Sequence, residues 1–181
     1  FTSDNGPYPR LAGRTNALRG CKISLYEGGI RLPFIARWPG SVKAGATDAT
    51  TVLSAVDMFP TLCHIAGAEL PADIRWDGQD QSAALLGKPQ PQRAQPIFWE
   101  YGRNEKFFGY PKGPGDRSPN LAIRDGQWKL LINADGTGAE LYNLSADPSE
   151  TKNVSAEHAD VTSRLQQNIL GWRQSLPRIA N

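Results

Sequence analysis

The chain has 181 residues, of which 39% are hydrophobic, and its 20 Lys and Arg against 18 Asp and Glu leave a formal net charge of +2. This is an ordinary globular composition, and it excludes collagen, a coiled coil and a disordered chain. Basic and acidic residues are interspersed, so no basic stripe that would follow nucleic acid is present. No apolar run reaches the roughly 18 residues needed to cross a bilayer. We therefore expect neither nucleic-acid nor membrane partners.

The first half of the chain is typical of an α/β structure. Residues 33–38 form a short apolar run that ends at a Pro-Gly turn signal, which predicts a buried strand. Asp57 near a cap, Pro60 in a first turn and Gly67 as a stop together predict a helix. The elements expected after the first strand are a short strand over 50–54, the helix over 57–67 and a helical turn over 82–86.

The second half predicts an antiparallel sheet with one terminal helix. Asp125-Gly126 between two strand-like runs is the strongest hairpin signal that a sequence offers. A helix that begins near Ser155 carries an apolar stripe from Val161 to Leu176 at helical spacing, which we expect to pack on the sheet. The expected strands are 96–101, 121–124, 127–132 and 139–144.

A stretch rich in Pro and Gln at 88–95 separates the two halves. We place a domain boundary there, with residues 1–92 as the remainder of a larger α/β domain and residues 93–181 as a small α+β domain. The chain opens on an apolar residue that leads into a turn, Phe-Thr-Ser-Asp-Asn-Gly. We therefore expect a fragment of a longer protein.

Polar residues near the start of the chain are candidates for an ionic ligand. Asp4 and Asn5 follow a strand-like end, where open α/β sheets collect ligands, and their oxygens suit Ca²⁺ or Mg²⁺. Asp-Asn-Gly is also ordinary turn chemistry, so both interpretations stay open. Lys22 lies between a glycine-bearing turn and a Gly-Gly pair, where its ammonium group can contact an oxyanion. The alternative for Lys22 is a solvated surface lysine.

Several motifs follow one another in a fixed order. They are Phe-Thr-Ser-Asp-Asn-Gly at 1–6, Leu-Arg-Gly-x-Lys-x-x-x-x-Glu-Gly-Gly-Ile-Arg-x-Pro at 18–33, Trp-Pro-Gly at 38–40, Asp-x-x-Pro-Thr-Leu at 57–62, Ile-Arg-Asp-Gly-Gln-Trp-Lys-Leu at 123–130 and Glu-Leu-Tyr-Asn-Leu at 140–144. In this order they resemble the C-terminal part of a type I sulfatase of the alkaline phosphatase superfamily. The resemblance implies the remainder of an alkaline-phosphatase-like α/β sheet domain, followed by a small antiparallel sheet packed with a C-terminal helix.

The resemblance also implies roles for single residues. Asp4 and Asn5 match two ligands of the family's active-site cation, usually Ca²⁺ with Mg²⁺ as the alternative, and Lys22 matches the lysine that contacts the sulfate. The family hydrolyses sulfate esters with a formylglycine made from a Cys or Ser in a Cys/Ser-x-Pro/Ala-x-Arg motif. Neither Cys21 nor Cys63 lies in such a motif. The nucleophile and the other metal ligands are thus expected upstream, and the chain by itself is expected to be inactive.

The same resemblance bears on the residues around the lysine. Family members often carry Gly-Gly-Lys-Gly where Gly20-Cys21-Lys22-Ile23 stands here, so this turn is bulkier. Glu27 and Arg31 are charged residues of the same segment, and we favour scaffold roles for both over active-site roles.

Residues 102–120 do not match the family and are too irregular for a helix or strand, so we expect a long ordered loop. In sulfatases the smaller C-terminal domain helps to shape the cleft entrance. The aromatic rings and positive charges of this loop suit a sulfated sugar or an aryl sulfate. The alternative is that the aromatic residues pack the loop against the sheet. The candidate substrate-binding residues, beside Lys22, are Arg103, Phe107, Phe108 and Tyr110.

Two further functions stay open. One is a phosphate or phosphonate ester hydrolase of the same superfamily, which would differ at the upstream nucleophile, and the other is a non-catalytic relative that binds a sulfated glycan. The expected partner is a sulfate ester, either a small molecule or a sulfated glycan. Family habit places such proteins in the periplasm or outside the cell in bacteria, and in the lysosome or outside the cell in animals. We also expect exposed apolar sheet surface through which the chain self-associates.

Overall fold

The computed structural model describes residues 1–8, 15, 17–103, 109–113 and 115–177. The chain divides into two compact units, one of Phe1 with Phe34–Gln95 and one of Thr2–Pro33 with Pro96–Asn181. The segment 2–33 thus belongs to the same unit as the C-terminal sheet. The predicted division into residues 1–92 and 93–181 stays a prediction. Within the described ranges, no helix has the length and apolar character needed to cross a membrane.

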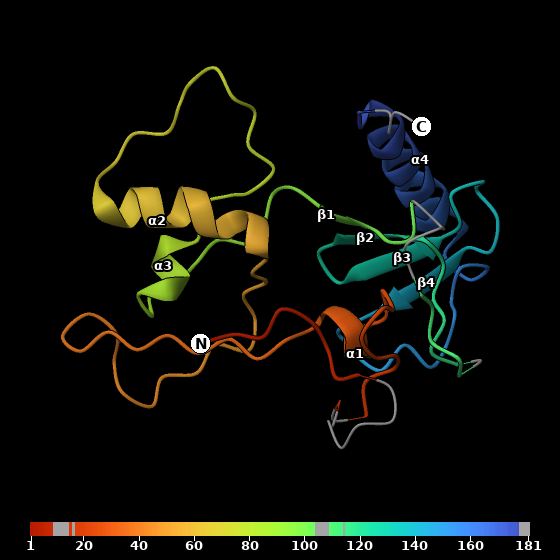
Figure 1. The fold of residues 1–181 in the computed structure, drawn as a ribbon, viewed down its shortest axis with the longest axis horizontal. Helices are drawn as coiled ribbons and strands as arrows, with labels where there is room; N and C mark the ends of the chain where they lie inside the picture. The colour runs from red at the N-terminus through yellow and green to blue at the C-terminus, as the bar shows by residue number, and fades with distance from the viewer. Residues whose placement is uncertain (9–14, 16, 104–108, 114, 178–181) are drawn as a thin grey trace. The chain divides into compact units, whose positions relative to one another are not determined.

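The unit of residues 34–95 contains three short helical elements, η1 (Ala55–Asp57), α2 (Met58–Ala66) and α3 (Ser82–Leu85) (Figure 1). Helix α2 confirms the helix predicted over 57–67. It ends at Gly67, which adopts a left-handed φ of 68° and donates its N–H to the carbonyl oxygen of His64. Helix α3 confirms the predicted helical turn over 82–86.

The carboxylate of Asp57 binds several parts of this unit and is more than a helix cap. Its side chain is fully buried. One carboxylate oxygen accepts the N–H of Ser54 at 2.8 Å and a guanidinium N–H of Arg93 at 2.6 Å, and the other accepts the N–H of Gln79 at 2.8 Å. A single carboxylate therefore joins η1, the segment before α3 and the end of the unit.

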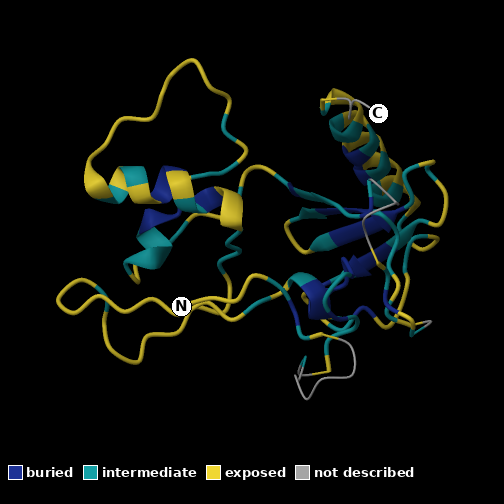
Figure 2. Cartoon of the chain, in the orientation of Figure 1, coloured by how far each residue is buried: buried dark blue, intermediate teal, exposed yellow. Residues whose placement is uncertain are grey.

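The strands predicted over 33–38 and 50–54 are wrong. Neither range forms a strand, and Ile35 and Trp38 are 59% and 48% exposed. This extended run pairs with the start of the chain, where Phe1 and Ile35 exchange two backbone hydrogen bonds of 2.7 and 2.8 Å. An apolar strand of a parallel sheet needs neighbouring strands and helices over both faces, and the described residues of this unit supply neither. Figure 2 shows this range as largely exposed.

The second unit contains the predicted antiparallel sheet. Its strands are β1 (Ile97–Glu100), β2 (Leu121–Asp125), β3 (Trp128–Ile132) and β4 (Glu140–Asn143), in the order β1-β2-β3-β4. The predicted hairpin is confirmed, but its turn lies one residue later than the Asp-Gly signal. Asp125 pairs with Trp128, which leaves Gly126 and Gln127 as a two-residue loop. Gly126 has a φ of 57°, as the first position of a type II′ turn requires.

Both faces of the sheet are buried. Helix α4 (Ala159–Ser175) covers one face with the fully buried Leu165 and Ile169, which confirms the predicted terminal helix and its apolar stripe. The other face is covered by Leu25 and Tyr26, which immediately precede the short helix α1 (Glu27–Ile30). Successive residues of a strand point alternately toward α4 and toward Leu25 and Tyr26. Both sets are buried, so the strand sequences are largely apolar without alternation. The segment that carries Lys22 is therefore part of the core of this unit (Figure 2).

Candidate active site

The turn around Lys22 has an unusual backbone. Gly20 and Ile23 have φ values of 83° and 70°, so two left-handed residues flank the Cys21-Lys22 pair. A β-branched residue with positive φ is an outlier, because its side chain crowds the backbone there. Ile23 thus adopts the conformation that a glycine adopts without strain. Strain of this kind is stored where the surrounding structure fixes the backbone, often at functional sites.

Asp4 and Asn5 lie in the same unit as Lys22, and backbone hydrogen bonds tie the two segments together. The N–H of Lys22 donates to the carbonyl oxygen of Pro7 at 2.8 Å, and the N–H of Gly6 donates to Gly29 at 2.9 Å. Gly6 and Pro7, which form these two bonds, are the first and second residues after Asn5. The fold therefore brings the predicted cation ligands and the predicted anion-binding lysine into one region.

The side chains in this region have oxygen and nitrogen atoms free for a ligand. Asp4 is exposed, and Asn5 donates its Nδ2 to the Gly6 carbonyl at 2.8 Å. The Oδ1 of Asn5 and the ammonium group of Lys22 form no hydrogen bond or ion pair with any residue in the described part of the chain. Asn5 and Arg31 help to line an open pocket of about 600 Å³. The donor set is two hard oxygen ligands and one cationic group.

This donor set fits part of a Ca²⁺ or Mg²⁺ site. Ca²⁺ takes about six to eight oxygen ligands, of which Asp4 and Asn5 supply side-chain oxygens for only a part. Among the residues that the structure describes, no group of three or more His, Cys, Asp or Glu side chains could hold a metal ion by itself. Asp4 and Asn5 would therefore supply only part of the coordination shell of such an ion.

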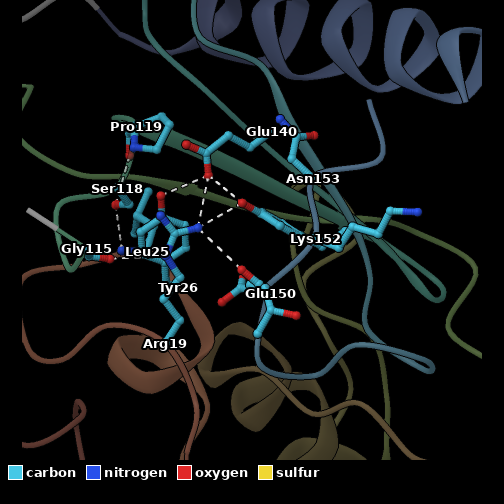
Figure 3. A network of polar contacts seen from close by, with 12 residues as sticks. Arg19, Leu25, Tyr26, Gly115, Ser118, Pro119, Glu140, Glu150, Lys152 and Asn153 are labelled. Carbon is cyan, nitrogen blue, oxygen red and sulfur yellow. Dashed lines mark hydrogen bonds and ion pairs between the residues drawn. The ribbon is translucent and has the colours of Figure 1, made fainter. Parts of the chain in front are cut away.

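A polar network around Arg19 fixes the start of the segment that carries Lys22 to the sheet (Figure 3). The guanidinium group of Arg19 lies 3.8 Å from the ring centroid of Tyr26 and donates to the hydroxyl of Tyr142 at 2.8 Å. Both tyrosine hydroxyls donate to one oxygen of Glu140, each at 2.8 Å. Burial raises the pKa of Tyr26 and of Tyr142 well above the usual range, and the hydrogen bonds to Glu140 raise these pKa values further.

A buried ion-pair triad fixes the end of the segment. The Nζ atom of Lys129 lies 2.9 Å from Glu27 Oε1 and 2.9 Å from Glu150 Oε1, and none of the three side chains is more than 3% exposed. The other oxygen of Glu150 accepts the backbone N–H of Glu27 at 2.6 Å. Burial raises the pKa of Glu150, and the charge of Lys129 opposes that shift. Glu27 thus has the scaffold contacts that its sequence context favours.

Sequence reasoning missed Lys129 and Glu150. The available signal for Lys129 was a single lysine inside the apolar strand Trp-Lys-Leu-Leu-Ile, where a charge needs a buried partner. Glu150 has a left-handed φ of 55°, and no sequence pattern predicts that conformation for a glutamate. Arg31, in contrast, is half exposed and lies 3.9 Å from the second oxygen of Glu27.

The loop over 102–120 contains no helix or strand in its described part, as predicted. Arg103 pairs with Glu100 at 3.7 Å. Tyr110 packs edge-on against Tyr101, with ring centroids 5.7 Å apart, and Arg117 lies 4.4 Å from the centroid of the Tyr110 ring. Tyr110 therefore has a packing role inside the loop and one ring face covered by a cation. The candidates Phe107 and Phe108 lie outside the described residues.

The far end of this loop contacts the segment that carries Lys22. Ser118 Oγ accepts the backbone N–H of Leu25 at 2.8 Å, and Arg19 Nε donates to the carbonyl oxygen of Gly115 at 3.1 Å (Figure 3). Burial raises the pKa of the Cys21 thiol, and the negative charge of Asp116 raises it further. The loop and the Lys22 turn are thus neighbours within one compact unit.

Comparisons with known proteins show which proteins this chain is similar to. Residues 21–175 match the family described as N-sulphoglucosamine sulphohydrolase, C-terminal. The chain is 35% identical over 193 residues to an N-acetylgalactosamine-6-O-sulfatase of Bacteroides thetaiotaomicron, covering 92% of this chain and 34% of the relative. It is 31% identical over 193 residues to human arylsulfatase A, covering 93% of this chain and 35% of that protein. The chain therefore spans about a third of the length of these curated relatives.

A solved structure extends the likeness to the fold. Ps i-CgsB, crystallised in complex with k-i-k-neocarrahexaose, superimposes with a TM-score of 0.74 at 29% identity, over 95% of this chain and 35% of that one. The predicted fold class, an alkaline-phosphatase-like α/β remainder followed by a small antiparallel sheet with a C-terminal helix, is thereby confirmed. The order of the motifs, the sheet covered by the Lys22 segment and the match over 21–175 agree. The chain therefore belongs to the sulfatase family, in its N-sulphoglucosamine sulphohydrolase C-terminal group.

Proposed function

We propose that this chain is the C-terminal part of an enzyme that hydrolyses sulfate esters of carbohydrates, and that it contributes Asp4, Asn5 and Lys22 to the active site. The observation that carries the proposal is the pairing of the two candidate segments. The Lys22 N–H bonds to Pro7 and the Gly6 N–H bonds to Gly29, in a chain of the sulfatase family. The chain alone is proposed to be inactive, because three groups do not complete a catalytic site.

Each residue has a chemical task in this proposal. Asp4 and Asn5 would be oxygen ligands of a Ca²⁺ or Mg²⁺ ion, which when bound polarises the sulfuryl oxygens. The ammonium group of Lys22 would donate to a sulfate oxygen and offset the negative charge that develops on the transferred group. A formylglycine nucleophile from outside these 181 residues would complete the site.

The proposed substrate class is a sulfated sugar, with an aryl sulfate as the smaller alternative. A similar protein is named for N-acetylgalactosamine 6-O-sulfate, and a similar structure holds an oligosaccharide. The loop over 102–120 adjoins the Lys22 segment through Ser118 and Gly115, which supports a role for it in substrate selection. In that role Arg103 and Tyr110, with Phe107 and Phe108, would contact the sugar. The proposed location, periplasmic or secreted, follows family habit.

The test uses the full reading frame that encodes this chain. The purified enzyme is assayed with sulfated monosaccharides, an aryl sulfate and the matching phosphate esters, in buffers with and without Ca²⁺. Lys22→Ala is expected to lower kcat/KM for the sulfate ester by about 10²- to 10³-fold, the usual loss for one donor on a developing anion. Lys152→Ala is the matched control, because Lys152 is an exposed lysine whose partner is Glu157.

Two results would overturn the proposal. Faster turnover of the phosphate esters would indicate a phosphate or phosphonate hydrolase. Tight binding of a sulfated glycan with no turnover of any ester would indicate a non-catalytic binding protein.

Asn5→Ala is expected to raise the Ca²⁺ concentration needed for half-maximal activity, and an unchanged concentration would remove Asn5 from the ligand set.

A further inference from the structure

We propose that Lys129 and Glu150 are positioning residues, which act through Glu27 to hold the Lys22 turn and Asn5 in their working geometry. The inference rests on the proposed function, because it assigns a task to residues remote in sequence from the candidate site. It concerns the buried triad of Lys129, Glu27 and Glu150, whose side chains come together only in the folded chain.

The first step of the argument is the link from the sheet to α1. Lys129 is the second residue of β3 and is completely buried. Its ammonium group contacts both carboxylates at 2.9 Å, while Glu150 also accepts the backbone N–H at the start of α1. The side chain and the main chain of Glu27 are therefore both held. Two directional contacts to one residue fix the orientation of α1 on the sheet as well as its position.

The second step is the link from α1 to the candidate site. The N–H of Gly28 donates to the carbonyl oxygen of Arg19 at 2.7 Å, which closes the loop that contains Lys22. The carbonyl oxygen of Gly29 accepts the N–H of Gly6, the residue after Asn5. Glu27, Gly28 and Gly29 are consecutive, so any shift of α1 moves both the Lys22 turn and the Asn5 backbone.

The third step concerns why charged groups occupy this place. Removing three charged side chains from water is costly, and apolar side chains of the same volume would often serve the fold as well. The oxygen Glu27 Oε2 is buried without a hydrogen-bond partner among the described residues, and its ion-pair partner Arg31 lies 3.9 Å away. What the triad supplies and an apolar cluster does not is direction. Directional anchoring matters where misplacement by about 1 Å lowers a rate by about 10²-fold.

The experiment uses the full-length enzyme and separates positioning from stability. Lys129→Met removes the cation that two buried carboxylates share and can prevent folding, so the main variant is Lys129→Met with Glu27→Gln and Glu150→Gln, which removes all three charges together. The matched control is Ile169→Val, a core substitution on the opposite face of the sheet. All proteins are assayed well below the lowest melting temperature.

Three readouts are compared. The triple variant is expected to lose kcat by about 10- to 100-fold, the range seen when residues that orient active-site groups are changed. It is also expected to need more Ca²⁺ for half-maximal activity, and to exchange the amide hydrogens of Gly6, Lys22 and Gly28 faster. The control is expected to keep the wild-type values of all three, even where its melting temperature falls.

Wild-type kcat and wild-type exchange at these amides in the triple variant would overturn the inference, whatever its melting temperature, and would leave the triad a fold-stabilising cluster. Faster exchange with unchanged kcat, in an enzyme that Lys22→Ala inactivates, would overturn it as well. If Lys22→Ala itself leaves turnover unchanged, the proposed function fails. The exchange rates then decide by themselves whether the triad holds the turn.

Discussion

The backbone of Gly6 passes so close to that of Gly28 that a β-carbon built on Gly6 would overlap the Gly28 carbonyl oxygen. A β-carbon built on Gly28 would in turn overlap the carbonyl oxygens of Arg19 and Gly20. Three backbone segments thus meet without side chains between them. This close packing holds Asn5 beside α1 and the Lys22 turn.

Gly6→Ala is therefore expected to destabilise the chain by about 1–3 kcal/mol, the usual cost of overpacking, because only backbone atoms oppose the new methyl group. Gly171→Ala is the control. Gly171 lies inside α4 with no atom within 4 Å of an added β-carbon, so alanine there should stabilise the helix by about 0.5–1 kcal/mol. Urea unfolding measures both, and a Gly6→Ala chain as stable as wild type would contradict the close packing.

Asp57→Ala should remove the contacts that join the parts of the unit of residues 34–95. The substitution leaves Arg93, whose side chain is 8% exposed, without its carboxylate, and breaking such a buried pair costs about 3–5 kcal/mol. Asp57→Asn keeps the shape and one acceptor and is expected to cost less. Hydrogen exchange of the α2 amides reports the loss, and exchange as slow as in the wild type in both variants would show that the ion pair contributes nothing.

Tyr26 and Tyr142 provide a test in alkaline solution. Burial and the Glu140 carboxylate raise both pKa values in the folded chain, so the folded state holds these protons more tightly than the unfolded state. Their contribution to stability is complete below the ordinary tyrosine pKa of about 10 and is lost as the pH rises above it. We expect the two phenols to ionise only as the chain unfolds, which NMR of labelled tyrosine rings can follow.

The control for this titration is Glu140→Gln. It removes the negative charge beside both phenols, so their pKa values should fall and ionisation should begin at lower pH. Ionisation of Tyr26 or Tyr142 near pH 10 in a folded wild-type chain would be inconsistent with the network of Figure 3.

Self-association of the isolated chain through exposed sheet surface stays a prediction, and helix α2 offers a further exposed apolar surface. Phe59 and Leu62 are apolar residues of this helix and are 53% and 55% exposed. Sedimentation velocity of the 181-residue chain is expected to show association that increases with concentration and that Leu62→Gln weakens. A single monomeric species at the highest concentration would refute it.

The sequence predicts the second unit well because its signals are local. The hairpin turn, the α4 stripe and the apolar strands are each legible within a few residues, and their partners lie inside the chain. The strand over 33–38 was predicted wrongly because an apolar run specifies burial but cannot specify what buries it. The Lys129 triad joins positions 27, 129 and 150, a relation that no local pattern encodes.

A sheet with two covered faces has a consequence for any attempt to exchange parts between relatives. One cover, α4, follows the strands in sequence, but the other cover precedes them and includes Leu25 and Tyr26. In a chimera joined at residue 93, the strands would come from this chain and the segment that covers them from a relative. Lys129 would then have to pair with the residue that the relative has at the position of Glu27. Grafts that transfer 2–33 together with 96–177 would carry the interface intact, and with it the lysine turn.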